Sequence, residues 1–456
     1  MDASVDDEEI VHGASTGARP RRLAFRHLLT PEGFVAERAL VLDATGTIVA
    51  IEPGEAPWAG WCALPAMVDA HSHAFHHLLT GLGERAATRA TFWSWRELMY
   101  RAAERLEPED LELVATVAYE ALRLGGYATV GEFHYLHRGR DGRFAPALAE
   151  ALVRAANRVG VRLVLIPALY RRGGYDRPLE GAQWRFSTPD LALFLDHVAM
   201  LPTVVRAIAI HSLRAVEPEV AERFVSLARA RFGEGCRLHV HAAEQRAEVD
   251  EVVRHEGRGP IEVLDVHGLL DERTAVIHAT HATPEERSLI TQRGARVVLC
   301  PSTEAYLGDG HFPLVSFLRE GGHWALGSDA NVRPDALGEL RALEFEARLR
   351  DERRVRLVPE GAPLAATLWS RAARDGAWCL GLNVGELRIG CQADLLVVDP
   401  ADSPWASDDP ARFLDACLVG DPGRAFEDVR LGGIRRAPLA VRDPIHWRLC
   451  LARFRR

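Results

Sequence analysis

The chain has 456 residues, 48% hydrophobic and 26% charged, with a formal net charge of −9 at pH 7. This length and composition suit one barrel-sized catalytic domain with a smaller companion, not a series of small modules. The net negative charge argues against a nucleic-acid partner, and no apolar run reaches the roughly 18 residues of a membrane span.

Segments near the two ends of the chain have similar sequences, typical of β-strands. Residues 1–20 are acidic, then polar, and lack the apolar core of a signal peptide, so we predict a disordered leader there. Residues 21–64 include "ALVLDATGTIVAIEPGEA", and residues 381–456 include "LNVGELRIGCQADLLVVDP". Both read as strands separated by turns. We expect these two segments to form a small β-sandwich built from both chain ends, with a C-terminal tail.

Residues 65–380 alternate short apolar runs with longer stretches of helical period. "RVGVRLVLIPALY" follows "PALAEALVRAAN", and "CRLHVHAAE" follows "PEVAERFVSLARARF". Such alternation predicts a parallel sheet covered by helices on both faces, and at this length a TIM-type (β/α)8 barrel is the leading expectation. The predicted fold class is therefore α/β.

The stretch "MVDAHSHAFHHLL" places His71, His73, His76 and His77 within seven residues. The text before it reads as a strand buried on both faces, and alternate side chains of a strand point the same way. His71 and His73 would then converge at the strand end, as a zinc site requires. Alone, this pair is a weak signal, because a solvated histidine-rich turn would read the same.

Further polar residues stand where later apolar runs end. A single histidine at a strand end is commonly structural. Core packing does not predict a histidine or aspartate at the ends of several separate apolar runs. In a barrel of this kind, the reactive groups lie at the carboxyl ends of the strands. The residues are His211 with Arg214, His241 with Glu244, His278, and Asp329.

Three imidazoles and one carboxylate make a mononuclear site that leaves a position open for water. A zinc ion lowers the pKa of its water to about 7. Glu244 would lie close enough to exchange a proton with that water, unless it is an exposed loop carboxylate. We expect His239 to lie deeper in the barrel. The expected metal ligands are His71, His73, His241 and Asp329.

Lysine is absent, so every one of the 55 Lys+Arg residues is arginine. Schiff-base chemistry, P-loop phosphate binding and a carboxylated lysine between two metals are therefore excluded. The seven cysteines form no C-x-x-C pair. This suits a reducing compartment, so we expect a cytoplasmic protein.

The ordered motifs resemble the amidohydrolase superfamily, particularly its mononuclear deaminases. "HSHAF", "FWSWRELMYR", "HSLRAV", "HVHAAEQRAEVDEV", "PSTEAYLGDG" and "LGSDANV" narrow the resemblance to the formimidoylglutamate deiminases, from roughly residue 21 to the C-terminus. The resemblance implies hydrolysis of the formimino C–N bond of N-formimino-L-glutamate to N-formyl-L-glutamate and ammonia, a step of histidine degradation. It also implies one divalent ion, expected to be Zn²⁺, and a homodimer.

By the same resemblance, Glu244 would relay the proton, while His278 and Asp329 would orient the attacking water and stabilise the tetrahedral centre. A small dicarboxylate substrate needs fixed cations, and the arginine fork pairs with a carboxylate through two hydrogen bonds. The expected substrate-binding residues are His76, Arg96, Tyr135, His211 and Arg214.

The chain departs from the family pattern at His76, where glutamine is usual, and in "DANV" after the metal-binding aspartate. A formimino-aspartate, a guanidino acid or another acyl amidine therefore stays open as the substrate. Deamination or dechlorination of a heteroaromatic ring is an alternative, and Arg96 and Arg214 discriminate, because such rings lack two carboxylates. A non-catalytic barrel is a third reading, against which Glu244 and His278 argue.

Overall fold

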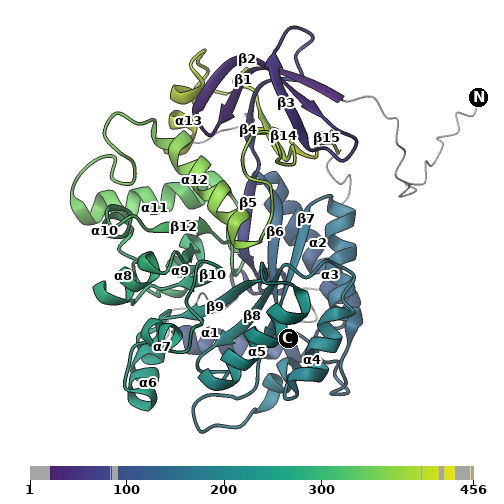
Figure 1. The fold of residues 1–456 in the computed structure, drawn as a ribbon, viewed down its shortest axis with the longest axis vertical. Helices are drawn as coiled ribbons and strands as arrows, with labels where there is room; N and C mark the ends of the chain where they lie inside the picture. The colour runs from purple at the N-terminus through teal and green to yellow at the C-terminus, as the bar shows by residue number, and fades with distance from the viewer. Residues whose placement is uncertain are drawn as a thin grey trace, which may run out of the picture.

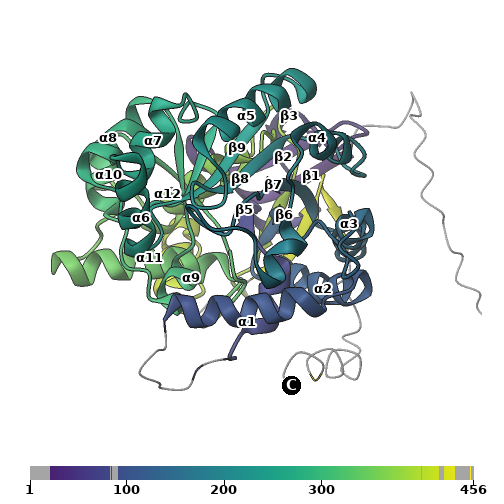
Figure 2. The ribbon, with the colours of Figure 1, turned by 90° about the horizontal axis from the view of Figure 1, so that it is seen from below.

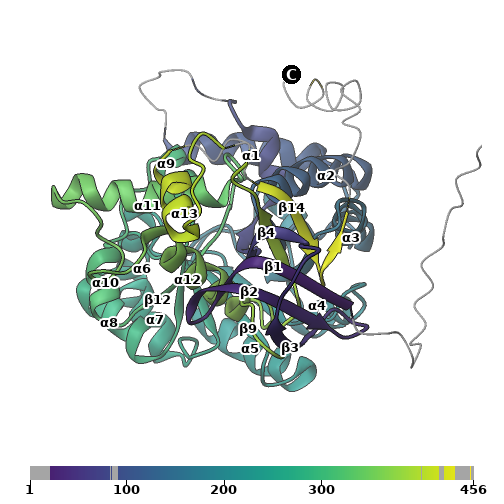
Figure 3. The same cartoon turned by 90° about the horizontal axis from the view of Figure 1, so that it is seen from above.

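The computed structural model describes residues 21–82, 84, 91–401, 403–420, 426–436 and 452. The predicted leader and most of the predicted C-terminal tail lie outside these ranges. The described chain forms an eight-stranded barrel with a seven-stranded sheet at one end of it (Figures 1 and 3). In the described ranges, no helix is both long enough and apolar enough to span a membrane.

The barrel strands follow one another in chain order, and each pairs in parallel with the next. A parallel bridge between Ser72 and Asp329 brings the segment after the last strand against the first. The expected TIM-type barrel is thus confirmed. Its strands are β5 (Met67–Ser72), β6 (Tyr127–His134), β7 (Arg162–Leu169), β8 (Ala207–Ser212), β9 (Arg237–Ala242), β10 (Thr274–His278), β11 (Arg296–Leu299) and β12 (His323–Leu326).

Helices surround the barrel, as the view along it shows (Figure 2). Several begin with proline in the first turn, where the missing N–H has no helical partner to lose. The helices are α1 (Phe92–Arg105), α2 (Pro108–Leu124), α3 (Pro146–Val159), α4 (Leu191–Ala199), α5 (Pro218–Phe232), α6 (Arg246–Glu256), α7 (Pro260–Val266), α8 (Pro284–Gln292), α9 (Pro301–Leu307), α10 (Leu314–Arg319), α11 (Ala336–Asp351), α12 (Leu364–Cys379) and α13 (Pro410–Val419), with 3-10 turns η1 (Ala74–Leu79) and η2 (Gly181–Phe186).

The second sheet combines strands from both ends of the chain, which confirms the expected β unit. It is one continuous sheet in which β4 pairs with β13, in the order β15-β14-β13-β4-β1-β2-β3. Phe25, Leu40 and Val397 belong to a small apolar core of its own. The strands are β1 (Arg21–Thr30), β2 (Gly33–Leu42), β3 (Ile48–Pro53), β4 (Gly60–Pro65), β13 (Leu395–Val398), β14 (Phe426–Leu431) and β15 (Ile434–Arg435).

The segment expected to be strand-like from Leu382 to Pro400 is mostly irregular, and only Leu395–Val398 forms a strand. Gly385 and Gly390 have φ of 78° and 90°, the left-handed region that glycine tolerates. A Cβ at Gly385 would lie 2.3 Å from the carbonyl oxygen of Ala373, so the loop lies directly on α12. The apolar residues of this segment therefore pack without strand pairing.

Candidate metal and active site

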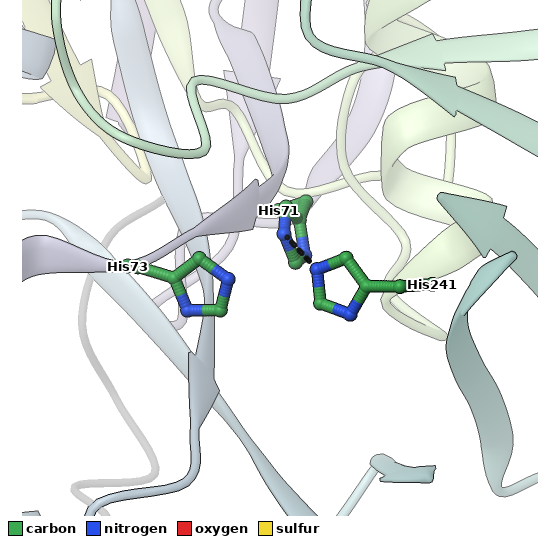
Figure 4. A group of neighbouring side chains, drawn as sticks. All are labelled: His71, His73 and His241. Carbon is green, nitrogen blue, oxygen red and sulfur yellow. Dashed lines mark hydrogen bonds between the residues drawn. The ribbon is translucent and has the colours of Figure 1, made fainter. Parts of the chain in front are cut away.

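The four expected metal ligands come together at the carboxyl ends of the barrel strands. His71 and His73 lie at the end of β5, His241 is on β9, and Asp329 follows β12. All four side chains are buried. Figure 4 shows the three imidazole rings pointing toward one another from two strands.

The spacing of these atoms suits a single ion. The Nε2 atoms of His71 and His241 are 3.1 Å apart, and Asp329 Oδ1 lies 3.6 Å from Nε2 of both His71 and His73. Two nitrogens bound tetrahedrally to zinc at about 2.0–2.1 Å stand roughly 3.3 Å apart. The donor set therefore fits a divalent cation, with three neutral nitrogens and one carboxylate.

Backbone carbonyls fix the orientation of two of the rings. Nδ1–H of His73 donates to Phe133 O at 3.0 Å, and Nδ1–H of His241 donates to His211 O at 2.9 Å. Because a carbonyl oxygen only accepts, each Nε2 keeps its lone pair toward the site. Burial lowers the pKa of His71, His73 and His241 well below the ordinary histidine value, which favours the neutral, metal-binding form.

Asp69, not anticipated from the sequence, joins the β5 end to the segment after β12. It accepts hydrogen bonds from Ser328 N at 2.9 Å, Ser328 Oγ at 2.6 Å and His71 N at 3.2 Å. Burial raises its pKa to about 7. Gly327 allows this close approach, because a Cβ there would lie 2.9 Å from the Cβ of His71. An acid in the otherwise apolar run "MVDA" was the available signal.

The backbone is strained where the strands end at the site. Five non-glycine residues here have positive φ, a conformation that side chains disfavour. Such strain is maintained only where the surrounding contacts determine the geometry, and it concentrates at functional sites. The residues are Ala243 (54°), His278 (68°), Ala279 (51°), Asp329 (44°) and Asn331 (54°).

Glu244 and His278 form a pair beside the expected ligands. His278 Nε2 lies 3.8 Å from Glu244 Oε1 and 3.7 Å from Asp329 Oδ2. Burial raises the pKa of Glu244 to about 7, in the range that a proton relay near neutral pH requires. Burial lowers the pKa of His278, but Glu244, the hydrogen bond to Glu304 and Asp329 outweigh it and raise the pKa to about 10.

A second carboxylate, Glu248, holds the turn that carries Glu244. It accepts from the backbone N–H of Glu244 at 2.9 Å and of Ala243 at 3.2 Å. Glu248 is buried on the first turn of α6. This role could not be predicted from the sequence, because "AEQRAE" contains other acids that could equally be exposed.

One cavity joins the expected catalytic and substrate-binding residues. His73, His241, Glu244, His278 and Asp329 line it on one side. All five expected substrate-binding residues also line this cavity. Five aromatic side chains form a further wall of the cavity, and these could not be predicted from the sequence. The substrate-binding residues are His76, Arg96, Tyr135, His211 and Arg214, and the aromatic wall is Phe92, Trp95, Tyr100, Tyr170 and Phe186.

Arg96 and Arg214 bring two positive charges to this cavity, and within the described ranges neither forms an ion pair. Arg214 is buried, and its Nη1 has no hydrogen-bond partner. Arg96 lies over the rings of Trp93 at 4.4 Å and Tyr100 at 5.5 Å. Burial lowers the pKa of Arg96, and the charge of Arg214 lowers it further. Although the charge of Glu248 also acts on Arg214, two guanidinium groups without an ion-pair contact would attract an anionic ligand.

His76 contacts Tyr135 at the cavity wall. Its Nε2 lies 2.7 Å from the Tyr135 hydroxyl, and its Nδ1 is buried without a hydrogen-bond partner. Burial lowers the pKa of His76 to about 4, so the ring is neutral near pH 7. His77 instead donates from Nδ1 to Asn331 O at 2.9 Å, and His239 donates from Nε2 to Cys379 O at 2.9 Å.

Comparison with known proteins adds a family to this geometry. Residues 62–422 match the family model described as "Amidohydrolase family". Formimidoylglutamate deiminase of Pseudomonas aeruginosa is 38% identical over 421 residues, which cover 89% of this chain and 92% of that protein. A 5-methylthioadenosine/S-adenosylhomocysteine deaminase of Natronomonas pharaonis is 28% identical over 386 residues, 83% of each chain.

Solved structures have the same fold. The crystal structure of an amidohydrolase from Brucella melitensis gives a TM-score of 0.86 at 31% identity and covers 95% of this chain and 100% of that one. An adenosine deaminase from Xanthomonas campestris, solved with bound zinc, gives 0.76 at 23% identity, covering 95% and 97%. At that identity, the likeness shows the fold alone. Together, these matches confirm the resemblance that the sequence motifs indicated.

Proposed function

Because the chain belongs to the amidohydrolase family and is a hydrolase of C–N bonds other than peptide bonds, we propose that it is a formimidoylglutamate deiminase. The reaction is hydrolysis of N-formimino-L-glutamate to N-formyl-L-glutamate and ammonia. The alternative substrates are another formimino or guanidino acid, or a heteroaromatic ring.

One observation carries the choice of substrate class. Arg96 and Arg214 line the same cavity as Glu244 and His278, and neither has an ion-pair partner among the described residues. A substrate with two carboxylates would neutralise both guanidinium groups and place its remaining polar end toward the metal ligands. A ring without carboxylates would leave both guanidinium groups without an ion-pair contact, which is costly for the buried Arg214.

The proposed metal is one Zn²⁺ ion, held by His71, His73, His241 and Asp329. When bound, zinc acts as a Lewis acid and lowers the pKa of a water molecule to about 7. Neutral imidazoles and one carboxylate are ligands that zinc accepts.

The protein's own groups then manage binding and protons. Arg96 and Arg214 bind the two carboxylates. The substrate also contacts Tyr135, His76 and His211, which line the same cavity. Water adds to the formimino carbon, and Glu244 accepts a proton from that water and delivers it to the terminal nitrogen.

As the C–N bond to the terminal nitrogen breaks, Glu244 also carries the hydroxyl proton of the tetrahedral adduct to that nitrogen. Ammonia then leaves, and a formyl carbonyl remains. His278 donates to the adduct and stabilises it, and Asp329 helps to orient the water.

Ammonia release from a panel of substrates tests the proposal. We expect release from formiminoglutamate to exceed that from formiminoaspartate and guanidinoglutarate, and we expect none from cytosine or guanine. Preference for a ring substrate, or no release from any amidine, would overturn it. The proposal includes a cytoplasmic homodimer in histidine degradation, and light scattering of the purified protein tests the dimer.

A further inference from the structure

We propose that Glu304 is a positioning residue that keeps a proton on Nδ1 of His278 and holds the ring in one orientation; this rests on the proposed function for its effect on turnover. Glu304 does not line the cavity, so it acts through His278 and not on the substrate. Glu304 is not among the residues that the sequence predicts for the site.

The contacts of Glu304 place its carboxylate directly behind the imidazole. His278 Nδ1 lies 3.1 Å from Glu304 Oε1, and the same oxygen accepts from Cys300 N at 2.9 Å. Glu304 is 7% exposed. A carboxylate anchored by a backbone N–H cannot rotate away without leaving that N–H unpaired in the interior, which is unfavourable.

This contact fixes what the other ring nitrogen can do. A proton held on Nδ1 by Glu304 leaves Nε2 facing Glu244 and Asp329, at 3.8 Å and 3.7 Å. Those two carboxylates lie on the Nε2 side, so Glu304 is the carboxylate partner of Nδ1 among the described residues. With His278 at a φ of 68°, its strained backbone depends on outside contacts to hold its geometry.

Glu339 on α11, which contacts the helix that carries Glu304, provides a matched control. Glu339 is 1% exposed and accepts from Ser302 N at 2.8 Å and from the Ser302 hydroxyl, so it secures the first turn of α9 as Glu304 does. Glu339 does not contact His278 in the described structure. A loss of activity that came only from loosening α9 would follow either substitution.

The first test is kinetic. Glu304→Gln should lower kcat about 10–100-fold, the usual cost of removing the partner of a site histidine, with KM for formiminoglutamate nearly unchanged. Glu304→Asp should recover part of kcat, Glu339→Gln should stay near wild type, and all three should keep the wild-type metal content. Equal losses in Glu304→Gln and Glu339→Gln, or an unchanged kcat in Glu304→Gln, would overturn the proposal.

The second test needs no substrate, so it separates this proposal from the proposed function. Nitrogen-15 NMR of histidine-labelled, metal-loaded protein reads the protonation of each ring nitrogen, with His278→Gln identifying the resonances. We expect a protonated Nδ1 in the wild type and in Glu339→Gln, and a changed Nδ1 signal in Glu304→Gln. Identical His278 signals in all three proteins would overturn the proposal even if ammonia is released.

Discussion

The Nε2 atoms of His71 and His241 lie 3.1 Å apart in the buried end of the barrel. Because Nδ1 of His241 already donates to a carbonyl, its Nε2 presents a lone pair to His71. A cation between the two rings would bind both lone pairs, and Asp329 supplies the balancing charge from 3.6 Å. The arrangement is therefore one that metal binding stabilises.

The first prediction separates a ligand from a nearby histidine. His241→Ala should lose the ion and lower ammonia release by orders of magnitude, because three donors remain of four. His239→Gln, two residues earlier on β9, should keep the ion, because His239 donates to Cys379 O instead. Metal analysis of both purified variants is the measurement, and equal ion content in the two would contradict the assignment.

The second prediction concerns the proton relay. Glu244→Gln keeps the shape of the side chain but cannot accept the proton, so turnover should fall by about 10²–10⁴ while the ion stays bound. Asp250→Asn, a change at an exposed position of α6, is the control and should behave as wild type. Near-normal turnover in Glu244→Gln would remove the residue from the mechanism.

The third prediction concerns charge in the cavity. Hydrogen bonds to charged groups contribute about 1.5–3 kcal/mol each, so Arg96→Gln or Arg214→Gln should raise KM for formiminoglutamate about 10–150-fold. A formimino substrate with both carboxylates amidated should show no comparable loss. Steady-state kinetics with the two substrates is the comparison, and parallel losses on both would count against carboxylate binding.

The fourth prediction links pH to stability at Asp271, away from the cavity. Burial raises the pKa of this carboxyl, but hydrogen bonds from Arg273 and Arg229, the latter at 2.8 Å and 3.2 Å, outweigh it and hold the pKa below its ordinary value. The unfolded chain therefore binds this proton at higher pH than the folded one, so the contribution is present above about pH 4 and is lost as pH falls through the folded-state pKa.

Asp271→Asn should accordingly be less stable than wild type at pH 7, on the order of 1–2 kcal/mol, and the gap should narrow on acidification. Urea unfolding of both proteins at pH 7 and at pH 3.5 measures this. A gap that widens toward acid would reverse the sign and contradict the assignment.

The strand-end residues could be predicted from the sequence because the two-residue period of a strand decides which side chains share a face. His71 and His73 follow from that rule, and the barrel itself brings His241 and Asp329 to the same end. Sequence motifs added Arg96, which lies on α1 and lines the cavity.

Contacts between distant segments could not be predicted in this way. Asp69 bonds to Ser328, 259 positions along the chain, and Glu304 bonds to His278 across 26 positions. Neither spacing follows from a local period, because each depends on how neighbouring strands and loops pack. The segment after α12 differs from its predicted strand for a similar reason, because Leu387 and Ala393 pack into the core of the second sheet without pairing as strands.

Metal content measured together with turnover tests the central claim most directly. The purified protein should hold one divalent ion per chain, release no ammonia from formiminoglutamate after chelation, and regain activity in proportion to the zinc returned. His73→Ala and Asp329→Ala should neither hold the ion nor regain activity. Full ammonia release from the metal-free chain, or an ion retained when these side chains are removed, would contradict the account.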